Sequence, residues 1–383
     1  MAFAISRNRN NASITIADAH CFPEVGVPWF WPLAFAQAGL ALTDRTLKFL
    51  AEVARTQVER PAPRWATANR VVLELHTLRL RDFSIRAAAH PVLVLPPYAG
   101  HASTIADFHA GQSLVATLRE NGCERVFVAD WSSATPEMRD YDIDNYLAEL
   151  AAVVDDLGGK VALVGLCQGG WLATMYAARF ADHVSRLVLA GAPIDTDAGD
   201  GLILEAAHRL PIGFFRQLVA LGDGRLKGNF MLQGFKNMHP DKQYVDKFVE
   251  LYEHIDDSSY VSRFEQFERW YEHTIDLPGR FYLQAVQELF KENRLAKGEF
   301  VALGKRLDLK AIRCPLYLLG GARDDITPPD QVFHAGRLVG TPRHAIVQAT
   351  ADGGHIGLFM RREVLENHWT HIARWLAGTG TKE

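Results

Sequence analysis

Cysteine is scarce in this sequence, and the few cysteines lie far apart. The 383 residues contain Cys21, Cys123, Cys167 and Cys314, with no C-x-x-C pair and no histidine at metal-ligand spacing. A disulfide framework or a structural zinc site needs clusters of this kind. We therefore expect no metal site, and we expect a reducing compartment, the cytoplasm.

The chain also lacks a strong charge of either sign and a clear hydrophobic span. Its formal net charge is −4, which gives no general attraction to nucleic acid. Arg7 and Arg9 are followed by polar residues, so no secretory signal is predicted. The charge-free stretch Val25–Thr43 is nearly as long as a membrane span, but Pro28 and Pro32 interrupt it. We expect no transmembrane anchor and interpret this stretch as a core or interfacial segment.

From Pro91 onward, short apolar segments alternate with helical ones. Segments that are apolar throughout and separated by helices are typical of a parallel sheet covered on both faces. Upstream, two alternating runs within residues 69–85 predict an antiparallel pair. The predicted parallel strands are Val92–Leu95, Val126–Ala129, Val161–Val164, Leu187–Leu189, Leu316–Leu319 and Ala345–Val347, and the predicted helices are Ser113–Asn121, Asp144–Leu157 and Gly170–Phe180.

This alternation breaks after Pro193 and resumes at Pro315. The sequence between them is rich in aromatic and charged residues, which is typical of a helical cap inserted over the site of an α/β sheet. The cap aromatics either line a substrate channel or form the cap's own core: Phe214, Phe215, Phe230, Phe235, Trp270, Tyr271, Phe281 and Tyr282. The predicted domains are an N-terminal extension at 1–69, an α/β core at 70–195 and 305–383, and a helical cap at 196–304.

The segment GLCQGG at 165–170 follows a strand-like run and opens a helical one. It has the form of the G-x-S-x-G nucleophile elbow of the α/β-hydrolase fold, with Cys167 in place of serine. The sharp, strained turn requires small residues two positions before and after the nucleophile, and the helix N-terminus favours an anionic thiolate. A tight turn around a buried cysteine is the alternative. The strand–helix junction favours Cys167 as the nucleophile, and Trp171 is interpreted as a packing residue.

Two later loops carry the expected partners in the expected chain order. LGGARDDITP at 319–328 and DGGHIG at 352–357 each come directly after a strand-like run. We predict that His355 is the base and that Asp324, in preference to Asp325, orients it. A polar turn and an ordinary loop histidine are the alternatives, and the order nucleophile, acid, histidine favours the triad.

An oxyanion hole should lie beside the elbow. We predict that it combines the backbone N–H of Gln168 with one from the loop PPYAGH at 96–101, at Tyr98 or Ala99. We interpret His101 in the same loop as making a local hydrogen bond in preference to a catalytic role. The other three cysteines are interpreted as structural.

At these motifs the sequence resembles the superfamily of polyhydroxyalkanoate synthases and intracellular poly(3-hydroxybutyrate) depolymerases, whose members carry cysteine in the elbow. The resemblance covers roughly residues 70–376. It implies that Cys167, Asp324 and His355 hydrolyse poly(3-hydroxybutyrate) held in cytoplasmic granules, without a cofactor. The segments similar to the depolymerase branch are PPYAGHAST at 96–104, APIDT at 192–196, FERWYEHTIDLPGRFYLQAV at 267–286, DDI at 324–326 and GHIGLF at 354–359.

Other segments are similar to the short synthases that act with a partner subunit: CQGG at 167–170, GQSLVATL at 111–118 and NRLAKGEF at 293–300. The alternative function is therefore an acyltransferase that takes 3-hydroxyacyl groups from coenzyme A. A non-catalytic granule-surface protein and a small-molecule lipase or thioesterase also stay open. The expected partners are a polyester substrate, a granule surface contacted through Val25–Thr43, and a second copy in a homodimer.

Overall fold

A computed structural model describes residues 46, 48–53, 62–87, 89–98, 100–239, 241, 243 and 246–378 of the chain. Val25–Thr43, Cys21 and Ala99 lie outside these residues, so the predictions made for them stay predictions. No helix among the described residues is long and apolar enough to cross a membrane.

Within the described residues, the central sheet has eight strands in the order β1-β2-β6-β3-β7-β8-β13-β14. The pairs β1–β2 and β2–β6 are antiparallel, and the other neighbours are parallel. The predicted mostly parallel sheet, with an antiparallel pair at its start, is confirmed. The strands are β1 (Arg70–Glu74), β2 (Leu78–Asp82), β3 (Val92–Leu95), β6 (Val126–Trp131), β7 (Val161–Leu166), β8 (Val184–Ala190), β13 (Leu316–Gly321) and β14 (Ile346–Ala351).

Side chains alternate across this sheet and fill a hydrophobic cluster on each face. Along β3, Leu93 and Leu95 join one cluster while Val92 and Val94 join the other. This alternation follows from the two-residue repeat of a strand, and burial on both sides explains why the strands are apolar throughout. One face carries α4 (Ile143–Asp156), α5 (Gln168–Arg179) and α12 (Pro329–Phe333), and the other carries α3 (Leu114–Glu120) and α16 (Thr370–Ala377).

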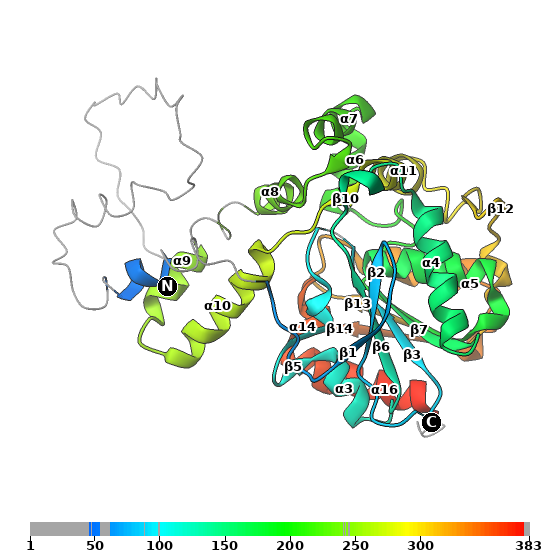
Figure 1. Cartoon of the computed structure of the whole chain (residues 1–383), viewed down its shortest axis with the longest axis horizontal. Coiled ribbons are helices and arrows are strands. Elements are labelled where there is room, and N and C mark those ends of the chain that lie inside the picture. The colour runs from blue at the N-terminus through cyan, green and yellow to red at the C-terminus, as the bar shows by residue number, and fades with distance from the viewer. Residues whose placement is uncertain are drawn as a thin grey trace.

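Between β8 and β13 the chain is mainly helical. Figure 1 shows α6, α7, α8 and α11 grouped beyond one end of the sheet, with α9 and α10 extending to one side. These helices are α6 (Leu202–Arg209), α7 (Ile212–Leu221), α8 (Gly228–Met238), α9 (Lys247–Glu253), α10 (Ser258–Glu272) and α11 (Gly279–Gln284), followed by the π-helix Ala285–Lys291. Short pairs β9 (Arg225–Leu226) with β10 (Leu277–Pro278) and β11 (Val301–Ala302) with β12 (Lys305–Arg306) also lie here.

Smaller elements complete the two ends of the core. The hairpin β4 (Asp107–His109) with β5 (Gln112–Ser113) precedes α3, and α13 (Ala335–Leu338) precedes β14. After β14 come α14 (Gly357–Met360), α15 (Arg362–Val364) and the π-helix Leu365–Trp369, which leads into α16. Since β7, β8, β13 and β14 run parallel, the loops at their carboxyl ends meet at one edge of the sheet.

Candidate active site

Cys167 occupies the turn between β7 and α5, as the sequence predicts. Its backbone has φ 50° and ψ −120°, a conformation that residues other than glycine rarely adopt. Two backbone hydrogen bonds hold the turn: the N–H of Cys167 donates to the Ala190 carbonyl (2.9 Å) and the N–H of Gly170 donates to the Cys167 carbonyl (2.8 Å). The strained residue is therefore fixed between neighbouring β8 and the start of α5.

The positions two before and two after Cys167 admit only glycine. A Cβ atom on Gly165 would lie 2.5 Å from Cα of Gly170, and one on Gly169 would lie 2.0 Å from the carbonyl oxygen of Leu95. Both contacts are with backbone, which cannot move aside as a flexible side chain could. The expectation of small residues around the turn is confirmed, and the elbow is pressed against the end of β3.

His355 and Asp324 meet in the loops that follow β14 and β13. The Nδ1 atom of His355 lies 2.8 Å from Oδ2 of Asp324, whose side chain is fully buried. His355 also shares a side-chain hydrogen bond with Cys167. Phe359 meets the imidazole edge-on, at 5.4 Å between ring centres and 90° between planes. The structure thus brings Cys167, His355 and Asp324 together, and their catalytic roles are taken up as a proposal below.

The electrostatic setting of His355 favours the charged imidazolium. Burial alone lowers the pKa of this side chain, because a charge loses water on entering the interior. Electrostatic attraction to Asp324 and Cys167, with the side-chain hydrogen bonds to both, outweighs burial and raises the pKa of His355 well above its ordinary value of 6.5.

The two neighbouring aspartates have different partners. Besides holding His355, Asp324 accepts hydrogen bonds at Oδ1 from the backbone N–H groups of Ile326 (3.1 Å) and Thr327 (2.8 Å). Asp325 instead lies 2.7 Å from Nε2 of His239, in the segment that follows α8. Asp324, and not Asp325, therefore contacts His355. The pair His239–Asp325 joins the helical segment to the core, and no sequence pattern pointed to it.

The predicted oxyanion donors lie at the elbow and on the loop after β3. Gln168 is the first residue of α5 and lines the cavity described below. The Tyr98 side chain is fully buried and points into the core, where its hydroxyl contacts the Tyr146 hydroxyl at 2.7 Å. The roles of the Gln168, Tyr98 and Ala99 N–H groups stay predictions.

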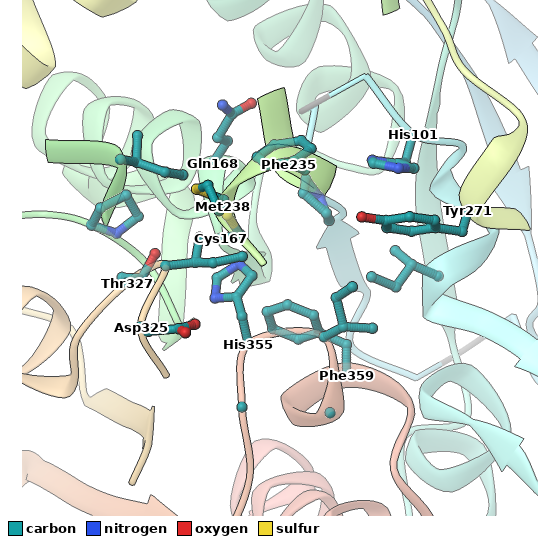
Figure 2. Close-up of a pocket in the computed structure, with 18 of the residues that line it drawn as sticks. His101, Cys167, Gln168, Phe235, Met238, Tyr271, Asp325, Thr327, His355 and Phe359 are labelled. Carbon is teal, nitrogen blue, oxygen red and sulfur yellow. The ribbon is translucent and has the colours of Figure 1, made fainter. Parts of the chain in front are cut away.

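A cavity of about 320 Å³ covers Cys167 and His355 (Figure 2). This volume lies at the lower end of the range of about 300–1,000 Å³ for small-molecule sites. Its surface is mostly apolar. The core contributes Pro97, His101, Ile105, Cys167, Gln168, Pro193, Asp325, Ile326, Thr327, Gly354, His355, Ile356, Gly357 and Phe359, and the segment between β8 and β13 contributes Ile203, Phe235, Met238, His239, Gln243, Trp270, Tyr271 and Phe290.

The aromatic side chains of the helical segment divide between the two alternatives left open by the sequence. Phe235, Trp270 and Tyr271 line the cavity, whereas Phe215 and Phe281 are buried in packing and Phe214 is exposed. Phe290, in the same segment, also lines the cavity, although the sequence analysis did not name it.

His101 has ring contacts beyond the local hydrogen bond expected for it, and that expectation stays a prediction. It lines the cavity and stacks on Phe235, Trp270 and Tyr271, at 5.8, 5.0 and 5.2 Å between ring centres. A bridge to Thr274 also ties its backbone to the helical segment. No local motif predicts this, because all the ring partners come from distant helices.

Trp171, Cys123 and Cys314 lie outside the cavity lining. Trp171 is buried and its indole N–H donates to the Pro193 carbonyl (2.7 Å), so it is a packing residue, as expected. Burial raises the pKa of the Cys123 thiol to about 12 and that of Cys314 to about 11, which keeps both thiols protonated. Neither lines the cavity.

Sequence comparison relates the chain to polyester polymerases. It is 28% identical over 335 residues to the poly(3-hydroxyalkanoate) polymerase subunit PhaC of Haloferax mediterranei, an alignment that covers 83% of this chain and 66% of that protein. It is 27% identical over 295 residues to the subunit of the same name from Allochromatium vinosum, covering 75% and 81%. The chain thus spans slightly less than two thirds of the first relative's length. These relatives bear out the resemblance to the superfamily.

Structural comparison agrees with the predicted fold. The monoacylglycerol lipase of Paleococcus ferrophilus superposes with a TM-score of 0.51 at 16% identity, covering 79% of this chain and 99% of that one. This likeness concerns the fold alone, and the α/β-hydrolase fold is confirmed. A family model described as "Protein of unknown function (DUF3141)" matches residues 59–377. Since this match includes most of the sequence, the chain belongs to that family.

Proposed function

We propose that this protein is a thiol-dependent enzyme that forms a 3-hydroxyacyl thioester on Cys167 and transfers the acyl group to a hydroxyl acceptor. The observation that carries the proposal is the hydrogen bond between the Cys167 thiol and His355, which also contacts Asp324. Cys167 and His355 line a small, mostly apolar cavity. The similarity to poly(3-hydroxyalkanoate) polymerases supports the acyl class. It also favours transfer over the hydrolysis suggested by several sequence segments.

The first step is acylation of Cys167. The thiolate attacks the carbonyl carbon of a 3-hydroxyacyl-coenzyme A, and a bond forms between Sγ and that carbon. The carbonyl oxygen becomes an oxyanion, which the backbone N–H groups beside the elbow stabilise. The intermediate collapses, the bond to the coenzyme A sulfur breaks, and His355 gives its proton to the leaving thiol.

The second step transfers the acyl group. His355, now neutral, takes the proton of an acceptor hydroxyl, and the oxygen attacks the acyl-cysteine carbonyl. An ester bond forms, the bond to Sγ breaks, and the thiolate–imidazolium pair is restored. Asp324 stabilises the imidazolium throughout. Cys167 is only 7% exposed, which limits the access of competing water.

A hydrolase is the second candidate, because the segments at 96–104 and 267–286 resemble those of intracellular depolymerases. The same residues would attack an ester of the polymer, and water would replace the hydroxyl acceptor in the second step. Both reactions share the acyl-cysteine, so they differ in the donor and acceptor alone. No cofactor is needed for either.

The proposal also covers where the protein acts in the cell and what it contacts there. A polyester product or substrate implies a cytoplasmic granule surface, with Val25–Thr43 as the contacting segment. Removal of residues 1–60 should then release the protein from isolated granules, and retention by the truncated protein would contradict this contact. A homodimer stays part of the proposal, and sedimentation of the purified chain tests it.

The test of function uses purified wild type, Cys167→Ala and the control Cys314→Ala, whose altered residue does not line the cavity. Each is incubated with 3-hydroxybutyryl-coenzyme A, and released thiol, free acid and oligomer are quantified. We expect coenzyme A release with oligomer formation by wild type and by the control. For Cys167→Ala we expect a loss of rate of about 10³-fold or more.

Other outcomes separate the alternatives. Free acid without oligomer would replace transfer by thioester hydrolysis. Release of 3-hydroxybutyrate from amorphous polymer, with no reaction of the thioester, would establish the depolymerase. Full activity of Cys167→Ala would overturn the proposal as a whole, and a protein that uses neither substrate would favour a granule-surface role.

A further inference from the structure

A second pocket, of about 260 Å³, lies next to the cavity at Cys167 and is called the basic pocket below. Trp270 lines both spaces, and its indole N–H donates to the Ala102 carbonyl (3.0 Å). In the short helix Ser103–Ala106, Thr104 lines the basic pocket while its neighbour Ile105 lines the cavity. The two spaces are therefore adjacent, with Trp270 and this short helix contributing to both.

The charged side chains of the basic pocket are all of one sign. Arg64, which precedes β1, and Arg269, in α10, line it together with His109. No described residue that lines it is an aspartate or a glutamate. Neither arginine has a carboxylate partner within the described part of the chain. The pocket therefore presents positive charge that the residues around it do not compensate.

Another pocket of this protein shows arginines in the opposite situation. Arg139 and Arg280 line it together with Asp140, Asp142 and Glu288. Nε of Arg139 lies 3.4 Å from Oδ2 of Asp140, and Nη2 of Arg280 lies 2.9 Å from Oδ2 of Asp142. These positive charges are compensated within the protein, so this pocket has no comparable attraction for an anion.

Buried hydrogen-bonding groups without a partner also line the basic pocket. Thr104 is only 4% exposed, yet its hydroxyl makes no hydrogen bond with any described residue. Nδ1 of His109 and Oε1 of Gln266 are likewise buried without a described partner. Such groups are rare in folded proteins because each one lowers stability. A ligand rich in hydrogen-bond acceptors would satisfy the hydroxyl and the imidazole.

We propose that the basic pocket binds a phosphate or diphosphate group. Guanidinium groups match phosphate oxygens in charge and geometry, and hydrogen bonds to a charged group are stronger than neutral ones. The Thr104 hydroxyl and a ring N–H of His109 donate to the same oxygens, and the Gln266 amide turns its N–H₂ group toward them. The residues come from three distant segments of the sequence, so no local motif predicts the site.

This phosphate chemistry has two sources. The acyl donor of the proposed function carries a diphosphate and a phosphomonoester on its coenzyme A part, and the adjacency of pocket and cavity fits such a molecule. A separate phosphate-bearing molecule would instead make the basic pocket a second ligand site beside the cavity. Assignment to the acyl donor rests on the proposed function, whereas the binding of phosphate does not.

The first experiment measures the binding of inorganic pyrophosphate to the full chain by calorimetry at low ionic strength. We expect Arg64→Gln and Arg269→Gln each to weaken binding by about 10-fold, since each removes a charge-assisted hydrogen bond. The matched control is Arg280→Gln, whose guanidinium pairs with Asp142 in the other pocket. It should change the affinity by less than about twofold. No binding by wild type, or equal affinities in all variants, overturns the proposal.

Thr104→Val separates ligand binding from packing, because it keeps the shape of the side chain and removes the hydroxyl. We expect pyrophosphate affinity to fall by about 3- to 10-fold. Stability in urea should stay the same or rise, because the hydroxyl of the free protein has no described partner to lose. Lower stability with unchanged affinity would mean that the hydroxyl serves the fold, and would contradict its place in the site.

Displacement distinguishes the two sources. Coenzyme A and pantetheine, which lacks the phosphates, are titrated against bound pyrophosphate in the Cys167→Ala protein. Displacement by coenzyme A alone assigns the pocket to the acyl donor, and Arg269→Gln should then raise KM for 3-hydroxybutyryl-coenzyme A by about 10-fold. Failure of coenzyme A to displace pyrophosphate assigns the pocket to a separate phosphate-bearing ligand. Equal displacement by both contradicts the recognition of phosphate. These results need no turnover, so they stand even if the proposed function fails.

Discussion

The two sides of the cavity are held in place by different kinds of interaction. On the core side, Cys167 and His355 sit on loops that leave neighbouring parallel strands, and backbone hydrogen bonds and a buried carboxylate fix them. On the helical side, Tyr271 and Trp270 are positioned by ring packing between α10 and the loop after β3. His101 lies on a loop of the core, but its ring contacts are with residues of the helical side.

The two sides should therefore differ in how much change they tolerate. The core side carries Cys167 and His355, and its geometry at the elbow tolerates almost no change because backbone meets backbone. The helical side contributes side chains alone to the cavity, among them Phe235, Trp270 and Tyr271. Substitutions on the core side should therefore cause the largest losses of rate or stability. Substitutions that remove a contact between the two sides should cause the smallest losses.

The largest effect is expected for Asp324→Asn. It removes the charge that stabilises the imidazolium, so kcat should fall by roughly 10³- to 10⁴-fold with little change in the fold. The matched control is Asp325→Asn, whose carboxylate contacts His239 and not His355. Equal losses in the two variants would contradict the distinction between the neighbouring aspartates. Steady-state kinetics with 3-hydroxybutyryl-coenzyme A measure both.

The same variant gives a pH dependence of stability. The pKa of His355 is raised in the folded protein, so its charged form contributes stability that is fully present below the unfolded value of about 6.5. That contribution is lost as the pH rises through the raised pKa. The excess free energy of unfolding of wild type over Asp324→Asn should be largest between about pH 5 and 6.5 and shrink in alkali. An excess that grows with pH would contradict a raised pKa of His355 in the folded protein.

The next effect concerns the elbow. Gly169→Ala places a Cβ atom on the Leu95 carbonyl oxygen, and we expect a loss of about 1–3 kcal/mol in the free energy of unfolding. Gly234→Ala in α8 is the control, because its Cβ meets nothing within 4 Å. There we expect a gain of about 0.5–1 kcal/mol from helix propensity. Urea denaturation measures both, and a neutral Gly169→Ala would contradict the close approach.

The smallest effect concerns the contact between the two sides. His239 and Asp325 are 34% and 49% exposed, so a double-mutant cycle with His239→Ala and Asp325→Asn should give a coupling of only about 0.2–1 kcal/mol. The coupling should fall in high salt. The pair Arg323–Asp352, which is more exposed, should give less still. A coupling above about 2 kcal/mol would mean that this contact, and not aromatic packing, holds the helical side in place.

Much of the core could be predicted because its signals are local. The predicted strand Val92–Leu95 coincides with β3, and the elbow lies between β7 and α5 as expected. The choice of Asp324 over Asp325 agrees with the contact to His355. The boundaries of the N-terminal extension and the helical cap stay predictions, because composition marks a change of pattern without a defined edge.

The sequence by itself determined the α/β-hydrolase fold, the turn at Cys167 and the order of the residues that meet there. Each depends on a short run of residues, since strand burial and turn strain act over a few positions. Only the tertiary structure decided the His101 environment and the use of Phe235, Trp270 and Tyr271 as cavity lining. These contacts join helices to a loop more than a hundred residues away in sequence. Aromatic residues at helical spacing look alike whether they face a core or a ligand.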